Sequence, residues 1–246
     1  MKLILLRHGQ SKWNLENRFT GWQDVGLTEE GVQEAEFAAK QLIKQKIKIE
    51  SVYTSLLKRA SETAKIVTKI LSFPYNKVHH EWRLNERHYG ALQGLSKSET
   101  ATKYGEKQVK IWRRSFDIPP PLLNKDDPRN PIFNKKFNKL NVELPLGESL
   151  KDVIIRLYPF WDMFTKDMIS TQKNYMIIAH SNSLRAIIKI LDRISEEEIT
   201  SVEIPTGVPL IYTFTSSMEV LNKEYLLDKS ELEKRQKEIV EQGRPK

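Results

Sequence analysis

The sequence predicts a single α/β domain over residues 1–246, with helices on both faces of a mostly parallel sheet. Three short runs, 3–6, 52–55 and 175–179, are apolar or rich in β-favouring residues, which is typical of buried strands. Segments with helical spacing separate these runs, and this alternation is what a parallel sheet requires. We find no internal repeat and no boundary to a second domain.

The first two helices are predicted from a capping residue and from apolar spacing. Thr28 precedes two glutamates, and a hydroxyl followed by acidic residues is typical of a helix start. Apolar residues then recur at helical spacing over 32–42. The same spacing over 57–71 predicts a second amphipathic helix, whose first turn contains Arg59.

Two further helices begin at capping sequences. Ser96 is followed three residues later by a glutamate, so a helix is predicted there with Lys97 near its positive end. A cation in that position indicates a nearby anion, and an exposed lysine is the alternative. Ser149 precedes a long helix with an apolar stripe, and a kink is expected at Pro159. A shorter helix is expected over 184–191.

Two segments lack a pattern that would place them in the core. Residues 117–145 are rich in proline and poor in apolar residues, so we expect a long surface insertion. The last strand is predicted over 210–214. Beyond it the chain becomes strongly charged, and we expect a helical or flexible tail over 223–246.

The composition limits the classes of function. The chain has no cysteine, which excludes disulfides, thiolate metal sites and a cysteine nucleophile. A net charge of +8 raises the alternative of nucleic-acid binding, but no module with interleaved basic and aromatic residues accompanies it. No stretch approaches the ~20 apolar residues of a membrane span. We therefore expect a cytoplasmic protein without a nucleic-acid or membrane partner.

Candidate catalytic residues follow the predicted strands. His8 and His180 each come directly after one strand, and Arg59 lies shortly after another. The carboxyl ends of parallel strands meet at one edge of the sheet, where α/β proteins bind ligands and helix N-termini attract anions. Two histidines and several arginines are therefore expected to converge on a pocket for a small polyanion.

Several sequence blocks carry a family resemblance. In chain order they are LRHGQS with WN within 6–14, RFTGW at 18–22, WRLNERHYGALQG at 82–94, WRRSFDIPPP at 112–121 and AHSNSLR at 179–185. An RHG tripeptide alone is a weak signal, but these blocks occur in this order and span about residues 1–220. Together they resemble the histidine phosphatase superfamily, specifically its cofactor-dependent phosphoglycerate mutases.

The resemblance implies phosphoryl transfer through a phosphohistidine. His8 is the implied nucleophile and Glu86 the implied acid and base, while Arg7, Arg59 and His180 supply charge to the phosphoryl group. Arginine suits this task because its planar fork matches phosphate oxygens. The substrate-binding residues that the resemblance implies are Ser11, Asn14, Thr20, Gly21, Tyr89, Lys97, Arg113, Arg114, Ser181 and Asn182.

The resemblance also implies a reaction and partners. The expected activity is the glycolytic interconversion of 3-phosphoglycerate and 2-phosphoglycerate, primed by 2,3-bisphosphoglycerate and without a metal, in a homodimer or homotetramer. Minor bisphosphoglycerate synthase and phosphatase activities are expected beside it. The main alternative is a phosphatase of the same superfamily, which shares the histidines but needs an open site. A second alternative is a catalytically idle phospho-ligand or scaffold protein.

One position departs from the family pattern, because Ser181 stands where the family usually has glycine. If the backbone there needs a positive φ, a non-glycine residue costs about 1–3 kcal/mol. If the amide still points into the site, the serine hydroxyl adds a donor. We also expect the segment 117–145 and the tail to cover the site, since water would hydrolyse a phosphohistidine.

Overall fold

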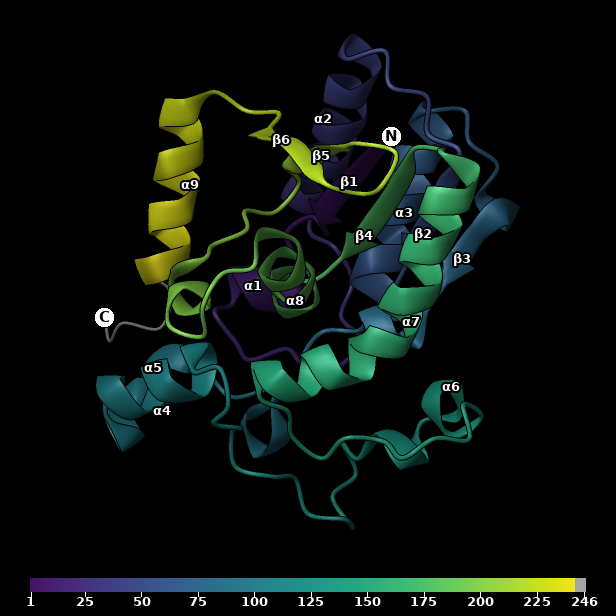
Figure 1. The fold of residues 1–246 in the computed structure, drawn as a ribbon. Helices are drawn as coiled ribbons and strands as arrows, with labels where there is room; N and C mark the ends of the chain where they lie inside the picture. Colours follow the sequence, from purple (N-terminus) through teal and green to yellow (C-terminus); the bar gives the residue numbers. More distant parts are fainter. Residues whose placement is uncertain (242–246) are drawn as a thin grey trace.

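The structure, a computed structural model, describes residues 1–241 and is built around one six-stranded sheet (Figure 1). The strands lie in the order β3-β2-β4-β1-β5-β6. Their bounds are β1 Lys2–Arg7, β2 Ser51–Thr54, β3 Val78–His80, β4 Tyr175–Ala179, β5 Pro209–Phe214 and β6 Val220–Tyr225. The first four in this order are parallel, whereas β5 and β6 are antiparallel to their neighbours. The prediction of a mostly parallel sheet is confirmed.

The register of the central strands brings their carboxyl ends together. Arg7 at the end of β1 lies opposite Ala179 at the end of β4, and Thr54 at the end of β2 lies opposite Ile178. The backbone N–H of His8 extends the ladder by donating to the carbonyl of Ala179 at 3.0 Å. The residues that follow these three strands therefore leave the sheet at one edge, as predicted.

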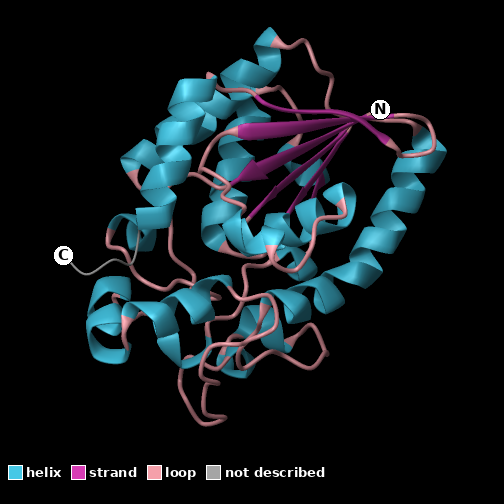
Figure 2. Ribbon diagram, turned by 60° about the vertical axis from the view of Figure 1, so that its left-hand side comes forward, coloured by secondary structure: helices cyan, strands magenta, loops and turns pink. Residues whose placement is uncertain are grey.

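Helices cover both faces of the sheet (Figure 2), which also confirms the prediction. Side chains of β1 alternate between the two layers, because neighbouring residues of a strand point to opposite faces. Leu3 and Leu5 pack with α7 (Leu150–Thr171) and α8 (Ser181–Asp192). Ile4 and Leu6 pack with the helices on the other face, α2 (Glu29–Lys44) and α3 (Lys58–Ile70).

The predicted helix caps are present. The Thr28 side chain accepts from the N–H of Gly31 at the start of α2. Ser96 accepts from the N–H of Glu99 at the start of α4 (Lys97–Tyr104). Ser149 forms a capping box with Asp152 at the start of α7. Pro159 lies inside α7, at the position of the predicted kink.

The segment 117–145 is a surface excursion that supports the core from outside. It contains the short η4 (Pro131–Phe133) and α6 (Lys135–Asn138), and Phe137 of α6 is buried against Trp22. The carbonyl of Pro121 accepts from the N–H of Ala91 at 2.8 Å, and Arg129 donates to the carbonyl of Gln93 at 2.7 Å. This segment therefore braces the loop around residues 89–93.

The prediction for the C-terminal part was wrong in one respect. The chain forms another strand after β5, namely β6, so residues 223–225 belong to the sheet and not to a tail. The side chains of β6 are almost all exposed, because β6 lies at the edge and packs through its backbone ladder. The helix expected beyond is α9 (Lys229–Glu241), and the rest of the predicted tail, 242–246, lies outside the described residues.

Two further helices and four single helical turns complete the elements of the part of the chain that the structure describes. The helix α1 (Lys12–Leu15) follows β1, and α5 (Glu106–Arg114) follows α4. Single turns of 3-10 helix lie at Tyr75–Lys77, Trp82–Leu84, Gly90–Leu92 and Glu198–Ser201. No helix within residues 1–241 is long and apolar enough to cross a membrane.

Candidate active site

A cavity lies at the carboxyl edge of the parallel strands and collects most of the predicted site residues. The predicted residues that line it are Arg7, His8, Asn14, Thr20, Gly21, Arg59, Glu86, Tyr89, Lys97, Arg113, Arg114, Ser181 and Asn182. They come from segments that are far apart in the sequence, and the strand ends and helix ends described above bring them together. Cations dominate this lining, and Glu86 is its carboxylate.

His8 is held in one tautomer. Its ring is buried, and Nδ1 lies 2.7 Å from the carbonyl oxygen of Gly9, which can only accept. On the other side of the ring, Nε of Arg59 donates to Nε2 at 3.2 Å. The proton therefore sits on Nδ1 and the lone pair on Nε2. Nε2 is the nitrogen that can attack phosphorus.

The surroundings of His8 also keep its ring neutral. Burial lowers the pKa of His8 well below its usual value of 6.5, and the charges of Arg59 and Arg7 lower this pKa further. The hydrogen bond to Gly9 acts in the opposite direction but is weaker. An unprotonated ring at neutral pH is what a histidine nucleophile requires.

Arg59 is fixed by carbonyl oxygens. It lies in the first turn of α3, is 1% exposed, and donates through Nη2 to Gly21 at 2.9 Å and through Nη1 to Gln23 at 3.1 Å. Gly21 has a φ of +55°, which L side chains rarely adopt, and a Cβ at this position would lie 2.1 Å from Oε1 of Gln93, so a larger residue would be strained and would displace the Gln93 side chain. The loop that carries Gly21 thereby aims the Arg59 guanidinium at His8.

His180 lies behind His8, with the ring centroids 4.9 Å apart. Its Nε2 is 2.7 Å from Oγ of Ser55, and that hydroxyl accepts from the N–H of Leu57 at 3.1 Å. The Ser55 hydroxyl proton is then directed to Nε2, which favours the tautomer with a proton on Nδ1. Nδ1 is buried and has no hydrogen-bond partner among the described residues, so it is a donor that a phosphoryl oxygen can satisfy.

One carboxylate oxygen of Glu86 accepts three hydrogen bonds. Oε1 accepts from the N–H of Arg87 at 2.8 Å and from the N–H and Nδ2 of Asn182 at 3.1 and 2.9 Å. Asn182 stands in the first turn of α8, so the helix N-terminus adds to the attraction for the carboxylate. The amide oxygen of Asn182 is itself held by Nη1 of Arg185 at 3.0 Å.

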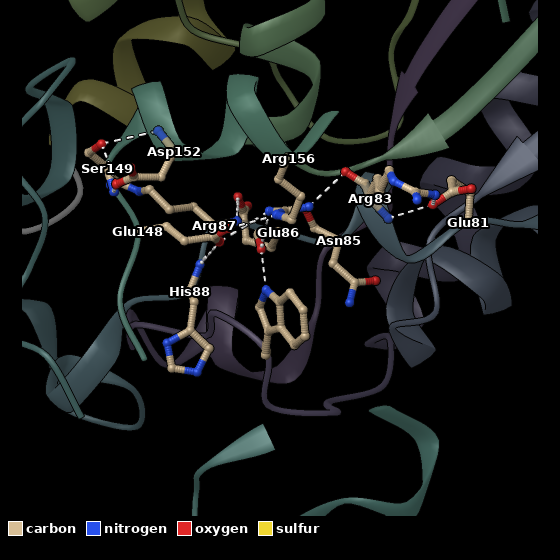
Figure 3. A network of polar contacts seen from close by, with 11 residues as sticks. Glu81, Arg83, Asn85, Glu86, Arg87, His88, Glu148, Ser149, Asp152 and Arg156 are labelled. Carbon is tan, nitrogen blue, oxygen red and sulfur yellow. Dashed lines mark hydrogen bonds and ion pairs between the residues drawn. The ribbon is translucent and has the colours of Figure 1, made fainter. Parts of the chain in front are cut away.

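The backbone on both sides of Glu86 is anchored by the network in Figure 3. Arg156 of α7 pairs with Glu148 at 2.7 Å and donates to the carbonyls of Arg83 and Asn85 at 2.7 and 3.2 Å. The indole N–H of Trp22 donates to the carbonyl of Glu86 at 2.6 Å. These contacts leave the Glu86 loop little freedom to move.

A second group of cations comes from α4 and α5. Lys97 is at the first position of α4, and Arg113 and Arg114 are the last two residues of α5. Because the arginines lie at a helix end, both can reach one cavity although they are adjacent in sequence. Burial, followed by the charge of Arg113, lowers the pKa of Lys97 well below 10.5, and burial lowers that of Arg113 to about 10.

The backbone at Ser181 is not strained. Ser181 is the first residue of α8 and is not among the residues with a positive φ. A serine at this position therefore does not destabilise the fold through a strained backbone. Ser181 lines the cavity, where its hydroxyl is an additional polar group.

The structure does not bring every predicted site residue to the cavity. Ser11 is fully buried, caps α1 and donates its hydroxyl proton to Asn14, so it shapes the wall without lining it. His180 is also fully buried and does not line the cavity, although its ring lies beside that of His8, where a phosphoryl group on His8 would meet it. The lining residues that the sequence analysis missed are Arg18, Phe19 and Ile239. Arg18 and Phe19 belong to the RFTGW block, which was a signal for them, whereas nothing marked Ile239 of α9.

The two segments expected to cover the site behave differently. None of residues 117–145 lines the cavity, so this segment supports the Tyr89 loop instead of closing the site. α9 does reach the cavity through Ile239. It is docked by Arg235, which lies 3.9 Å from Glu34 of α2, and by the Gln236 side chain, which donates to the carbonyl of Glu203.

The site contains groups for phosphoryl transfer. A neutral nucleophilic nitrogen faces a guanidinium, an anchored carboxylate lies across the cavity, and further cations surround the remaining space. Within residues 1–241, no three His, Asp or Glu side chains are grouped so that they could hold a metal ion.

Comparison with known proteins gives consistent matches. The model of the histidine phosphatase superfamily (branch 1) matches residues 3–223. Two curated proteins called 2,3-bisphosphoglycerate-dependent phosphoglycerate mutase are similar over nearly their whole length. The one from Dichelobacter nodosus is 47% identical over 98% of this chain and 99% of its own. The one from Hamiltonella defensa is 48% identical over 99% of this chain and 98% of its own.

Solved structures share the fold at low sequence identity. A mycobacterial glucosyl-3-phosphoglycerate phosphatase is 21% identical, with a TM-score of 0.67 over 91% of this chain and 96% of its own. The alpha-ribazole phosphatase from Shigella flexneri is 20% identical, with a TM-score of 0.65 over 90% and 95%. At these identities the likeness concerns the fold alone.

Proposed function

The chain belongs to the histidine phosphatase superfamily, and from this premise we infer that it is a phosphoglycerate mutase that depends on 2,3-bisphosphoglycerate. It interconverts 3-phosphoglycerate and 2-phosphoglycerate, a step of glycolysis, and is therefore an isomerase. The observation that carries this reaction is the near-full-length similarity, at 47% and 48% identity, to two proteins with that name.

The lining of the cavity fits a polyanionic priming ligand. The cations Arg7, Arg59, Lys97, Arg113 and Arg114 surround it, and Arg18 lies at its wall. Two buried donors, Nε of Arg7 and Nδ1 of His180, have no hydrogen-bond partner among the described residues. The oxygens of a bound anion would supply acceptors for both. 2,3-Bisphosphoglycerate supplies the phosphoryl group that loads His8. Arginine forks and a helix N-terminus are suited to such oxygens.

The proposed chemistry starts at His8. Nε2 attacks phosphorus, the P–N bond forms, and the bond from phosphorus to the oxygen of the bisphosphorylated ligand breaks. Glu86 donates a proton to the oxygen that leaves. In the return step the substrate hydroxyl attacks phosphorus on Nε2 while Glu86 takes the proton, so that protons and phosphoryl groups balance over the cycle.

The remaining residues stabilise charge and hold the substrate. Arg7, Arg59 and His180 meet the phosphoryl oxygens, where fixed donors stabilise the transition state most strongly. Further hydrogen bonds to the transferred phosphoryl group come from Asn14, Thr20, Gly21, Ser181 and Asn182. The end of the substrate away from the transferred phosphoryl group, called the non-transferred end, carries the carboxylate and a second phosphate. It is bound by Tyr89, Lys97, Arg113 and Arg114. Ser11 contributes by fixing Asn14.

Phosphorus NMR tests this function. The protein is incubated with 3-phosphoglycerate, a trace of 2,3-bisphosphoglycerate and excess chelator. We expect a 2-phosphoglycerate resonance without free phosphate. Inorganic phosphate alone would instead assign the chain to the phosphatases, the main alternative, and no change would leave an idle phospho-ligand protein.

The homodimer or homotetramer, the cytoplasmic location and the minor side activities stay predictions.

A further inference from the structure

The segment Glu203–Ile204, which does not itself line the cavity, holds two arginines that do. Oε1 of Glu203 lies 2.5 Å from Nη2 of Arg114. The carbonyl oxygen of Ile204 accepts from Nη1 of Arg7 at 2.7 Å. One short stretch of chain therefore contacts two of the cations that line the cavity.

The pair of Glu203 and Arg114 is buried, which fixes its geometry. The two side chains are only 6% and 14% exposed. A charge-assisted bond in such surroundings is short and costly to break, so the guanidinium has little freedom to turn. Because the guanidinium is planar and rigid, fixing Nη2 also fixes the directions of its other N–H groups.

The burial of Glu203 is not explained by the stability of the fold. Its second oxygen, Oε2, is buried and has no hydrogen-bond partner among the described residues. A buried carboxylate oxygen without a partner destabilises the folded state, and an apolar residue would fill the same space at lower cost. A carboxylate at this position therefore points to a role in the site.

The backbone that carries Glu203 is rigid. Pro205 follows Ile204 and restricts it to extended conformations, which aims its carbonyl at Arg7. Ile204 is 1% exposed, and Gln236 of α9 donates to the carbonyl of Glu203 at 3.1 Å. The carboxylate is thus presented to Arg114 from a support that is held on two sides.

We propose that Glu203 is a positioning residue for substrate recognition, which holds the Arg114 guanidinium in the orientation that binds the non-transferred end of the phosphoglycerate. The inference rests on the proposed function, which places Arg114 at that end. Glu203 touches no reacting atom, so its effect falls on substrate affinity more than on the rate of phosphoryl transfer.

Two substitutions separate geometry from charge. Glu203→Gln keeps the acceptor oxygen in place and removes the charge, whereas Glu203→Asp keeps the charge and withdraws the oxygen by one methylene. We expect Glu203→Asp to raise the KM for 3-phosphoglycerate about tenfold, and Glu203→Gln to raise it about threefold or less. In both variants kcat stays within about threefold of the parent value, because the His8 and Glu86 machinery is untouched.

The order of the two effects decides the proposal. A rise in KM for the Gln variant that equals or exceeds that for the Asp variant would overturn it, as would an unchanged or lower KM in both. A fall in kcat at constant KM would also overturn it. Glu224, exposed on β6, gives matched controls as Glu224→Asp and Glu224→Gln. The parent chain is assayed in parallel, since its inactivity would refute the proposed function and not the role of Glu203.

Discussion

Nε of Arg59 donates to Nε2 of His8 at 3.2 Å, so the guanidinium faces the nitrogen that attacks phosphorus in the proposed reaction. Nη2 and Nη1 of Arg59 each donate to a carbonyl oxygen, that of Gly21 and that of Gln23. Nucleophile and cation therefore form one unit that spans β1, α3 and the loop after α1.

We expect Arg59→Lys to lower kcat by about 10²–10³-fold, because a single ammonium cannot replace the three-sided contacts of the fork. The measurement is steady-state mutase kinetics, with thermal unfolding to confirm that the variant folds. Lys58→Arg, one residue earlier in α3 and exposed, is the matched control. Activity of Arg59→Lys close to that of the parent would contradict the role given to Arg59.

Stability should fall as the pH drops below 6.5, because buried histidines resist protonation in the folded state. Burial, followed by the charges of Arg156 and Arg129, lowers the pKa of His88 to about 3. Below pH 6.5 the unfolded chain binds a proton at His88 that the folded chain does not, so the free energy of unfolding decreases. From pH 7.5 to 5 this amounts to about 2 kcal/mol for His88. The lowered pKa values of His8 and His180 act in the same direction.

Urea unfolding at pH 7.5 and pH 5, in buffer without phosphate, measures this effect. His88→Asn should reduce the loss of stability between the two pH values by about 2 kcal/mol. His79→Asn, on the exposed edge of β3, should leave the loss as it is. If His88→Asn and the parent chain lose the same free energy of unfolding, the assignment to His88 is wrong.

Ser181→Gly should change turnover by less than about threefold. Ser181 already has a helical backbone at the start of α8, so glycine relieves no strain there. Glycine gives the unfolded chain more conformational freedom than serine does, so a small loss of stability is expected instead. The kcat of the two proteins gives the answer, and a gain in turnover above about tenfold would mean that serine impairs the site.

Ile239→Ala should raise hydrolysis of the phosphohistidine relative to transfer, because Ile239 lines the cavity from α9 and its loss admits water. Phosphorus NMR gives the ratio of inorganic phosphate to 2-phosphoglycerate, and we expect a severalfold increase. A chain that ends at Asp228, before α9, should show a larger increase. The neighbouring Val240→Ala is the control, since Val240 does not line this cavity. An unchanged ratio in both altered chains would refute the covering role of α9.

The sequence predicted the parts of the fold that have strong local signals. Thr28, Ser96 and Ser149 marked helix starts because a hydroxyl cap is a local feature of the chain. The position of His8 and His180 directly after apolar strands placed both histidines at one edge of the sheet. The family blocks then supplied the loop residues, such as Glu86, that no periodicity could have found.

The parts that were missed depend on tertiary contacts. β6 has exposed, mixed side chains and exists because β5 offers an edge to pair with, so its sequence shows no alternation. Ile239 reaches the cavity only because Arg235 and Gln236 dock α9 against Glu34 and Glu203. The partnership of Glu203 with Arg114 spans 89 residues of sequence, and no motif connects the two.

The central claim is that His8 carries the phosphoryl group between ligands. The protein is incubated with ³²P-labelled 2,3-bisphosphoglycerate, and one sample is then denatured to measure the label on the protein. A parallel sample is kept native and is chased with unlabelled 3-phosphoglycerate. We predict label on the protein that is stable to base and labile to acid, absent from His8→Ala, and transferred to phosphoglycerates in the chase. An unlabelled protein, label that persists in His8→Ala, or a chase that yields only inorganic phosphate would contradict the account.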